Sequence, residues 1–193
     1  MTGYRSPQHG FSLLELLISI VIFSVGLLAV AGLQTVSKQA NYESLQRSTA
    51  SQLAYGLLED MRTNGDGMQV YLAAVNLGGG KIQAEPVPNC SAAAECNAVQ
   101  KAAHDLWFWE RMVDGDFETN AGTGTGGLVL PSLCVTGPAL GNAGMYVVTI
   151  VWRGTASLTG GVANPCGAAS GNYGDNNEFR RILQIPTYID PNF

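Results

Sequence analysis

The stretch that decides the fold is GFSLLELLISIVIFSVGLLAVAGLQ, which runs from Gly10 to Gln34. Between Phe11 and Leu33 its single ionisable side chain is Glu15. As a helix, residues 11–33 would extend about 34 Å at a rise of ~1.5 Å per residue, which is enough to cross a hydrocarbon core of ~30 Å. The sequence therefore predicts a membrane-spanning helix that holds one carboxylate near its start.

A secretory signal peptide is the other common origin of such a segment. Its apolar region usually has roughly 7 to 15 residues and ends at a small-residue cleavage site. This segment is longer and continues directly into helix-compatible sequence. The residues before it, 1–10, include Arg5 and no acid. By the positive-inside rule we expect residues 1–10 in the cytoplasm and the chain after Gln34 across the membrane.

Helix-compatible sequence continues beyond the apolar segment. No Pro and no Gly pair interrupts it before TNGDG at 63–67, and apolar residues between Ala50 and Met61 recur at steps of three and four. This is the period of one buried helical face. We expect one helix from Phe11 to Arg62, about 78 Å long, with an apolar half (11–33) and an amphipathic half (34–62). The Asn-Gly and Asp-Gly steps would end it.

The rest of the chain, 63–193, is expected to form one globular domain. Apolar side chains at helical spacing predict a short helix over 98–113. Residues 144–154 and 178–189 have the β-branched and aromatic content of strands. Two Gly-rich connections are expected to be surface loops, at 114–127 and 154–177.

Composition and charge exclude several functions. The net charge of −5, with 13% charged residues, is small and of the wrong sign for a protein that coats nucleic acid. His104 and Asp105 are adjacent, but no nucleophile accompanies them and no Ser lies in a Gly-x-Ser-x-Gly turn. We therefore expect no enzymatic activity.

Four cysteines follow the apolar segment, at Cys90, Cys96, Cys134 and Cys166, and allow three pairings. An even set of this kind is typical of an oxidising compartment. The spacing favours a Cys90–Cys96 bridge and a Cys134–Cys166 bridge. A structural zinc site is the rival, but the chain has no Cys-x-x-Cys spacing and its two histidines are badly placed. Free thiols are the third alternative.

The N-terminal stretch resembles the start of type IV pilin precursors. In that family the leader ends with Gly, the mature helix begins with Phe, and the fifth residue of this helix is Glu. These positions are held here by Gly10, Phe11 and Glu15. The ending VGLLAVAGLQ is most similar to minor pilins of the PilV type. The resemblance implies an α+β, pilin-like fold, in which a long N-terminal helix packs on a small antiparallel sheet with long loops.

The same resemblance implies a life cycle. Prepilin peptidase would cut between Gly10 and Phe11 and methylate the new amine of a subunit that spans the inner membrane once, with 63–193 in the periplasm. The subunit would then enter a pilus near its tip with other minor pilins and the major pilin, prime assembly and help present a large tip adhesin. No cofactor is implied.

Three alternatives to this function stay open. One is a minor pseudopilin of a type II secretion system, and another is a plain single-span membrane protein with a periplasmic domain. The third is a pilin that captures DNA. Cleavage would remove Arg5 and leave nine Lys and Arg against fifteen acids, a net charge of −6 that would repel DNA.

Glu15 needs a partner in an apolar surrounding. A carboxylate at the centre of a bilayer costs about 2.5–3.5 kcal/mol, and less near the surface. After cleavage, the α-amine of Phe11 would lie within one helical turn of the depth of Glu15. The carboxylate of one subunit could then pair with the amine of its neighbour and set the axial register of assembly. Ser12 and Glu15 also fit a capping box, and the two roles can hold together.

Two glycines interrupt the apolar helix, Gly26 and Gly32. Many major pilins have Pro where this chain has Gly32. Each glycine weakens helix propensity by roughly 1 kcal/mol relative to Ala, which favours local melting. Small residues also allow close packing of helices in membranes. Both interpretations stay open.

Two further groups of residues are candidate sites. Trp107, Phe108 and Trp109 are successive aromatics, which one narrow helix face cannot bury together. One of them should be left partly exposed by the helix packing. Either a loop covers it, or it forms a contact surface for another subunit. The carboxylates of DGDFE, at 114–118, lack the full spacing of a calcium loop, so we expect a solvated turn there rather than a Ca²⁺ site.

Overall fold

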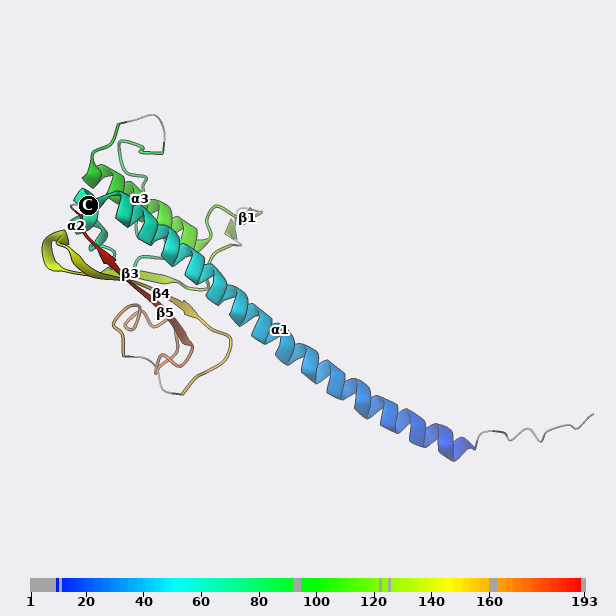
Figure 1. Ribbon diagram of the computed structural model, residues 1–193. Coiled ribbons are helices and arrows are strands. Elements are labelled where there is room, and N and C mark those ends of the chain that lie inside the picture. Colours follow the sequence, from blue (N-terminus) through cyan, green and yellow to red (C-terminus); the bar gives the residue numbers. More distant parts are fainter. Residues whose placement is uncertain are drawn as a thin grey trace, which may run out of the picture. The chain divides into compact units, whose positions relative to one another are not determined.

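The computed structural model describes residues 10, 12–91, 95–121, 123–124, 126–159 and 163–191. It divides into two compact units, Met1–Tyr42 and Glu43–Phe193. Figure 1 labels the helices and strands in chain order.

The first long element is helix α1, Leu13–Thr63. It confirms the long N-terminal helix expected from the sequence, which we placed at 11–62, although Phe11 lies outside the described residues. In the first unit the described side chains of α1 are exposed, including the apolar ones from Leu13 to Val36. Within the described part of the chain, α1 is the one helix long and apolar enough to cross a membrane.

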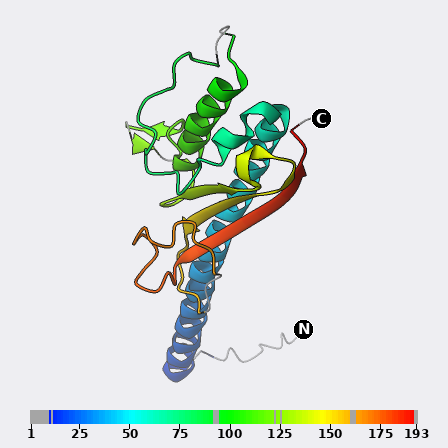
Figure 2. The ribbon, with the colours of Figure 1, turned by 90° about the vertical axis from the view of Figure 1, so that its left-hand side faces the viewer.

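The second unit is built on a three-stranded antiparallel sheet. Its strands are β3 (Ser132–Thr136), β4 (Gly144–Arg153) and β5 (Arg180–Ile189), in the order β3-β4-β5. Figure 2 shows the three strands side by side. Together with α1, this sheet confirms the α+β class. The predicted strands at 144–154 and 178–189 correspond to β4 and β5.

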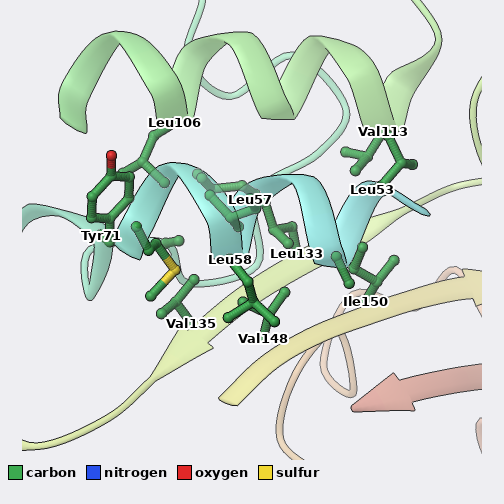
Figure 3. Packing of buried hydrophobic residues seen from close by; sticks show 14 of the residues in the cluster. Leu53, Leu57, Leu58, Tyr71, Leu106, Val113, Leu133, Val135, Val148 and Ile150 are labelled. Atoms are coloured by element: carbon green, nitrogen blue, oxygen red, sulfur yellow. The ribbon is translucent and has the colours of Figure 1, made fainter. Parts of the chain in front are cut away.

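The core of this unit lies on both sides of the second part of α1. Figure 3 shows that part between helix α3 (Ala98–Asp114) and the sheet. The apolar face predicted from steps of three and four is buried there, including Leu53, Leu57 and Leu58. On β4, Tyr146, Val148, Ile150 and Trp152 belong to this core, and Thr149 and Val151 between them are buried as well, so the strand is covered on both faces from Val148 to Trp152. These contacts make α1 the centre of the unit.

Helix α3 confirms the short helix predicted at 98–113. Asn97 and Gln100 form a full capping box at its start, and Gly115 in the left-handed conformation ends it. Ala102, Leu106 and Val113 are buried as the helical spacing indicates. Val99, at the same helical spacing near the start of α3, is 56% exposed.

Several short elements were missed in the sequence. The TNGDG stretch does end α1, but the chain then forms a 3₁₀ turn, η1 (Gly65–Gly67), and a one-turn helix, α2 (Met68–Tyr71), whose Met68 and Tyr71 are buried. A second 3₁₀ turn, η2, is Ala139–Gly141. Strands β1 (Thr119–Asn120) and β2 (Thr123–Gly124) form a two-residue hairpin ladder.

Both disulfides favoured by the spacing are present. Cys90 and Cys96 are bridged with a Cα separation of 5.8 Å, and Cys134 and Cys166 with one of 6.0 Å. The second bridge lies on the face of the sheet away from α1, where it packs with Val151 and Tyr173 in a small second core. It ties β3 to the loop that precedes β5. The pairing of all four cysteines excludes the zinc and free-thiol alternatives.

Candidate processing and assembly site

The start of α1 is fixed by Ser12. The Leu14 amide donates to the Ser12 hydroxyl oxygen at 3.3 Å, and the Leu16 amide donates to the Ser12 carbonyl at 3.2 Å. These are the bonds of an N-cap residue, whose side chain satisfies one of the free amides of the first turn. Glu15 is therefore the third residue of the helix.

Glu15 does not complete the capping box. Its side chain is exposed, and among the described residues no hydrogen bond joins its carboxylate to the Ser12 amide or to another group. Its backbone carbonyl accepts a bond from the Ser19 hydroxyl at 2.7 Å. The serine half of the box is formed, and the carboxylate is left accessible at the side of the helix.

The proposed cleavage junction is placed only in part. Gly10 is exposed and non-helical, and a Cβ added to it would meet nothing within 4 Å. Phe11 and residues 1–9 lie outside the described residues. The cut itself stays a prediction.

Other polar groups on the apolar part of α1 are satisfied within the helix. The Ser24 hydroxyl donates to the Ile20 carbonyl at 2.7 Å, and the Thr35 hydroxyl donates to the Ala31 carbonyl at 3.1 Å. Bonds of this type to the carbonyl four residues earlier remove the need for a partner in lipid. They leave Glu15 as the one charged side chain in an otherwise apolar and satisfied segment.

The two helical glycines lie in open surroundings. A Cβ on Gly26 or Gly32 would meet nothing within 4 Å. The packing of the subunit itself therefore does not require a missing side chain at either position. Both melting and close packing against another helix stay predictions.

A second polar cluster marks the beginning of the globular unit at Glu43. Its carboxylate accepts bonds from the Thr155 amide at 2.6 Å and the Thr155 hydroxyl at 2.8 Å. Arg181 adds two more from Nε and Nη2, both at 3.2 Å. Partial burial works to raise the pKa of Glu43, but the bonds from Thr155 and the charge of Arg181 outweigh it and lower this pKa. Sequence reasoning missed this cluster because its members are far apart in the chain.

The acids at the end of α3 bind backbone amides and an arginine. Asp114 accepts bonds from the amides of Gly79 and Gly80 at 2.8 and 2.9 Å. Burial raises the pKa of Asp114, and these amide bonds oppose the rise in part. Asp116 pairs with Arg111 at 2.7 Å. Within the described ranges, no group of three or more His, Cys, Asp or Glu side chains is arranged to hold a metal.

Glu110, one turn before Asp114, is the most deeply buried carboxylate, with 1% of its surface exposed. It accepts bonds from the amides of Gly78, Lys81 and Ile82 at 2.6 to 2.8 Å. Sequence reasoning missed this residue because charged residues on a helix normally face water. The GGG sequence at 78–80 was the available signal, because three glycines with positive φ let the amides of this loop turn toward the carboxylates of Glu110 and Asp114.

The three successive aromatics are all half-buried. Trp109 is held within the subunit, since its Nε1 donates to Asp60 at 2.7 Å and its ring lies against Gly56, where a Cβ would come within 2.2 Å. The Trp107 ring lies beside the Arg111 guanidinium at 5.4 Å. Phe108 contacts Phe117 with ring centroids 5.4 Å apart, and Phe117 is 54% exposed.

Their use as a contact surface for another subunit stays a prediction. His104 is buried, and its Nε2 lies 3.3 Å from a Glu85 carboxylate oxygen.

Two protein-family models match the chain. The model of the prokaryotic N-terminal methylation motif matches residues 5–31, and that of the family described as type IV pilin Tt1218 matches residues 32–107. The first match contains Gly10, Ser12 and Glu15, and the second contains the amphipathic part of α1 and part of α3. No curated protein and no solved structure matches the chain significantly.

Proposed function

Starting from a type IV pilin precursor, which both family matches support, we propose that this chain is a minor pilin of the PilV type. Prepilin peptidase cuts it between Gly10 and Phe11, and it then enters a type IV pilus at or near the tip. There it primes assembly with other minor pilins and helps to present a tip adhesin. Type IV pilins are structural subunits, and we propose no catalytic role for this one.

The observation that carries this proposal is the state of Glu15. The carboxylate lies at the start of an apolar, exposed helix and is not consumed by a capping bond to Ser12. It is therefore available to the α-amine of a neighbouring subunit. In an apolar surrounding that attraction is much stronger than in water.

The proposed division of the chain follows the same logic. Residues 1–10 are the leader, 11–33 span the inner membrane before assembly and line the filament after it, and 34–62 form the amphipathic half of the helix. Residues 63–193 form the periplasmic domain, which reaches the cell surface with the pilus. The two disulfides support exposure of this domain to an oxidising compartment.

The aromatic residues of α3 are the proposed contact with a neighbouring subunit. Phe108, with the exposed Phe117 against it, presents apolar surface, whereas Trp109 is used inside the subunit and Trp107 lies beside Arg111. Aromatic anchors of this kind contribute strongly to protein interfaces. The contact surface proposed for 107–109 is thus centred on Phe108.

The processing step is tested by expressing the full chain with and without prepilin peptidase and sequencing its N-terminus. A new end at Phe11 that depends on the peptidase is the expected result. An intact Met1, or a cut elsewhere, would contradict the proposal and favour a plain single-span membrane protein.

The assembly role is tested with Glu15→Leu. Loss of the carboxylate should leave membrane insertion unchanged, or improve it slightly, because an ion is removed from lipid. Entry into fibres should fall at least about ten-fold, as expected for loss of a charge pair worth more than ~1.4 kcal/mol in an apolar setting. The amount of the variant in sheared pili, compared with Ser19→Ala as control, measures this. Normal incorporation of Glu15→Leu would defeat the pairing hypothesis.

A further inference from the structure

The three-stranded sheet packs one face on α1 and turns its outer face away from it. The chain itself covers one half of the outer face, because the Cys134–Cys166 bridge, Val151 and Tyr173 form the second core there. The other half is bare. We propose that this bare half binds the same surface of a second copy of the chain. Such pairing requires neither cleavage of the chain nor its entry into a pilus.

The bare half is formed by side chains that alternate away from the core. Met145 is opposite Tyr188 in the β4–β5 ladder. Val147 lies between Pro186 on β5 and Thr136 on β3. These five side chains, named here the outer patch, include no charged group, and Met145 and Tyr188 are 54% and 63% exposed. A chain with a net charge of −5 can therefore approach a copy of itself here without bringing like charges together.

A small recess lies on the same face, beside the outer patch and at the border with the covered half. It holds about 130 Å³, is mostly apolar, and is lined among others by Val75, Cys134, Thr136, Thr149, Pro165 and Cys166. An apolar cavity of ~150 Å³ can hold a benzene molecule. The recess is therefore large enough to receive the edge of an aromatic ring or the end of a methionine side chain.

The outer patch and the recess are arranged so that two copies can complement each other. The strand order is β3-β4-β5, with Tyr188 on β5 and the recess beside β3. A two-fold axis along β4 places β5 of each copy over β3 of the other, and thus brings Tyr188 of each copy to the recess of the other. Two sheets that pack face to face have nearly aligned strands about 10 Å apart.

The size of this surface fits a dimer. The largest patch on a typical monomer is about 300–600 Å² and is often functional. With Val75, which lines the recess and is 63% exposed, the outer patch reaches this order. A standard interface takes about 800 Å² from each partner. The bare half therefore supplies most of the area that a dimer needs, and its large central residue, Tyr188, should contribute strongly to binding.

The test is the dimerisation constant of the full chain in detergent, measured by analytical ultracentrifugation. The natural chain should show a monomer–dimer equilibrium. Tyr188→Asp should lower the association constant at least about ten-fold, because each dimer would then bury two unpaired charges. Tyr188→Phe keeps the ring and should stay within about two-fold of the natural chain. Val87→Asp is the matched control and should have no effect, because Val87 is 93% exposed on a loop outside the sheet.

A mixing experiment separates this contact from association through the apolar helix. Thr136→Lys places a cation at the recess and should also weaken pairing between identical chains. A mixture of Thr136→Lys and Tyr188→Asp chains should form dimers again, because one of the two symmetric contacts then joins opposite charges and the other is natural. A monomeric natural chain would overturn the inference. Full pairing of Tyr188→Asp chains would do the same, as would a mixture that pairs no better than either variant alone.

Discussion

Glu43 shows how one side chain can connect distant parts of this fold. It lies on α1 at the first residue of the globular unit, and its partners Thr155 and Arg181 come from the loop after β4 and from β5. Hydrogen bonds to a charged group are each worth about 1.5–3 kcal/mol in favourable settings. This carboxylate therefore holds two segments that are far from it in the sequence.

The stability that Glu43 supplies should depend on pH. Its pKa is lower in the folded chain than in the unfolded one, so the contribution is present above the ordinary carboxyl pKa of about 4.3 and is lost as the pH falls through the folded value. Glu43→Gln should lower the free energy of unfolding by about 1–3 kcal/mol at pH 7. The difference from the natural chain should shrink between pH 6 and pH 3. Urea unfolding across this range measures it.

Glu59→Gln is the matched control for this prediction. Glu59 is on the same helix, but its pair with Arg62 at 3.4 Å is mostly exposed, and such pairs contribute little. A variant at Glu43 whose stability runs parallel to that of the natural chain over the whole pH range would contradict the assignment.

At the residue scale, the sequence indicated the special position of Glu15 but not the acids of α3 that bind a distant loop. A carboxylate in a long apolar run stands out from its neighbours. Glu110 and Asp114 lie on a helix of mixed composition, and nothing local distinguishes them from solvated acids. Both accept bonds from the amides of a loop, 78–82, that is about thirty residues earlier in the chain, and these amides compensate for the burial of Glu110 and the partial burial of Asp114. Only the tertiary structure brings the two together.

At the scale of elements, the two edges of the sheet are protected in different ways. The outer edge of β3 is covered, because Leu77 and Leu133 exchange backbone bonds at 2.7 and 2.9 Å. The other edge is the outer side of β5. The hydrogen-bonding phase of β5 follows from the Gly154 amide, which donates to the Phe179 carbonyl just beyond the last β4–β5 pair. In an antiparallel ladder the backbone groups of alternate residues point to opposite sides. The amides and carbonyls of the odd-numbered residues of β5 therefore point toward β4, and those of the even-numbered residues point to the open edge. Pro186 thus removes one donor from the open edge.

Restoring that donor should promote pairing between copies. Pro186→Thr adds an outward amide and a residue that favours strands. We expect the dimerisation constant of the full chain in detergent to rise about ten-fold, which corresponds to one or two net hydrogen bonds. Analytical ultracentrifugation measures this. Gln184→Thr, at an outward position that already has an amide, should cause no change, and an equal rise in both variants would show that the proline is not the cause.

The elements that the sequence predicted have strong periodic patterns or concentrated β-branched residues. Helices α1 and α3 and strands β4 and β5 are of this kind. Strand β3 was missed because it is five residues long and follows Pro131 directly. Helix α2 was missed because it has one turn and begins directly after a Gly-rich stop signal. Its formation depends on the burial of Met68 and Tyr71 and not on a local pattern.

At the scale of the whole molecule, the two disulfides should contribute unequally. The bridges close stretches of 6 and 32 residues. If a bridge acts by restricting the unfolded chain, the shorter contributes about 2 kcal/mol and the longer nearly 4 kcal/mol. Replacing Cys134 and Cys166 together by Ala should therefore cost about twice as much stability as replacing Cys90 and Cys96. Urea unfolding under non-reducing conditions compares them, and an equal or reversed order would contradict the expectation.

The pairing of the cysteines could be favoured from spacing, yet the sequence could not show what the bridges hold. The longer bridge is part of a small second core with Tyr173. Cys166 and Tyr173 belong to a stretch whose Gly-rich composition indicated only a surface loop. The contacts of the proposed assembly surface are beyond sequence reasoning for a related reason. Which of three adjacent aromatics stays exposed depends on partners such as Asp60 and Gly56, which belong to another helix.

The convergence of the globular unit on α1 has a practical consequence for trimming the protein. Glu43 accepts a hydrogen bond from the loop after β4, and Gln46 bonds the backbone at Gly127 and Val129. Arg62 donates to Thr187 on β5 at 2.6 Å. A water-soluble fragment that begins at Glu43 would lack the apolar part of α1 and keep all of these hydrogen bonds. A fragment that begins seven residues later, at Ala50, would lose the bonds of Glu43 and Gln46, and Arg181 would lose the carboxylate with which it pairs.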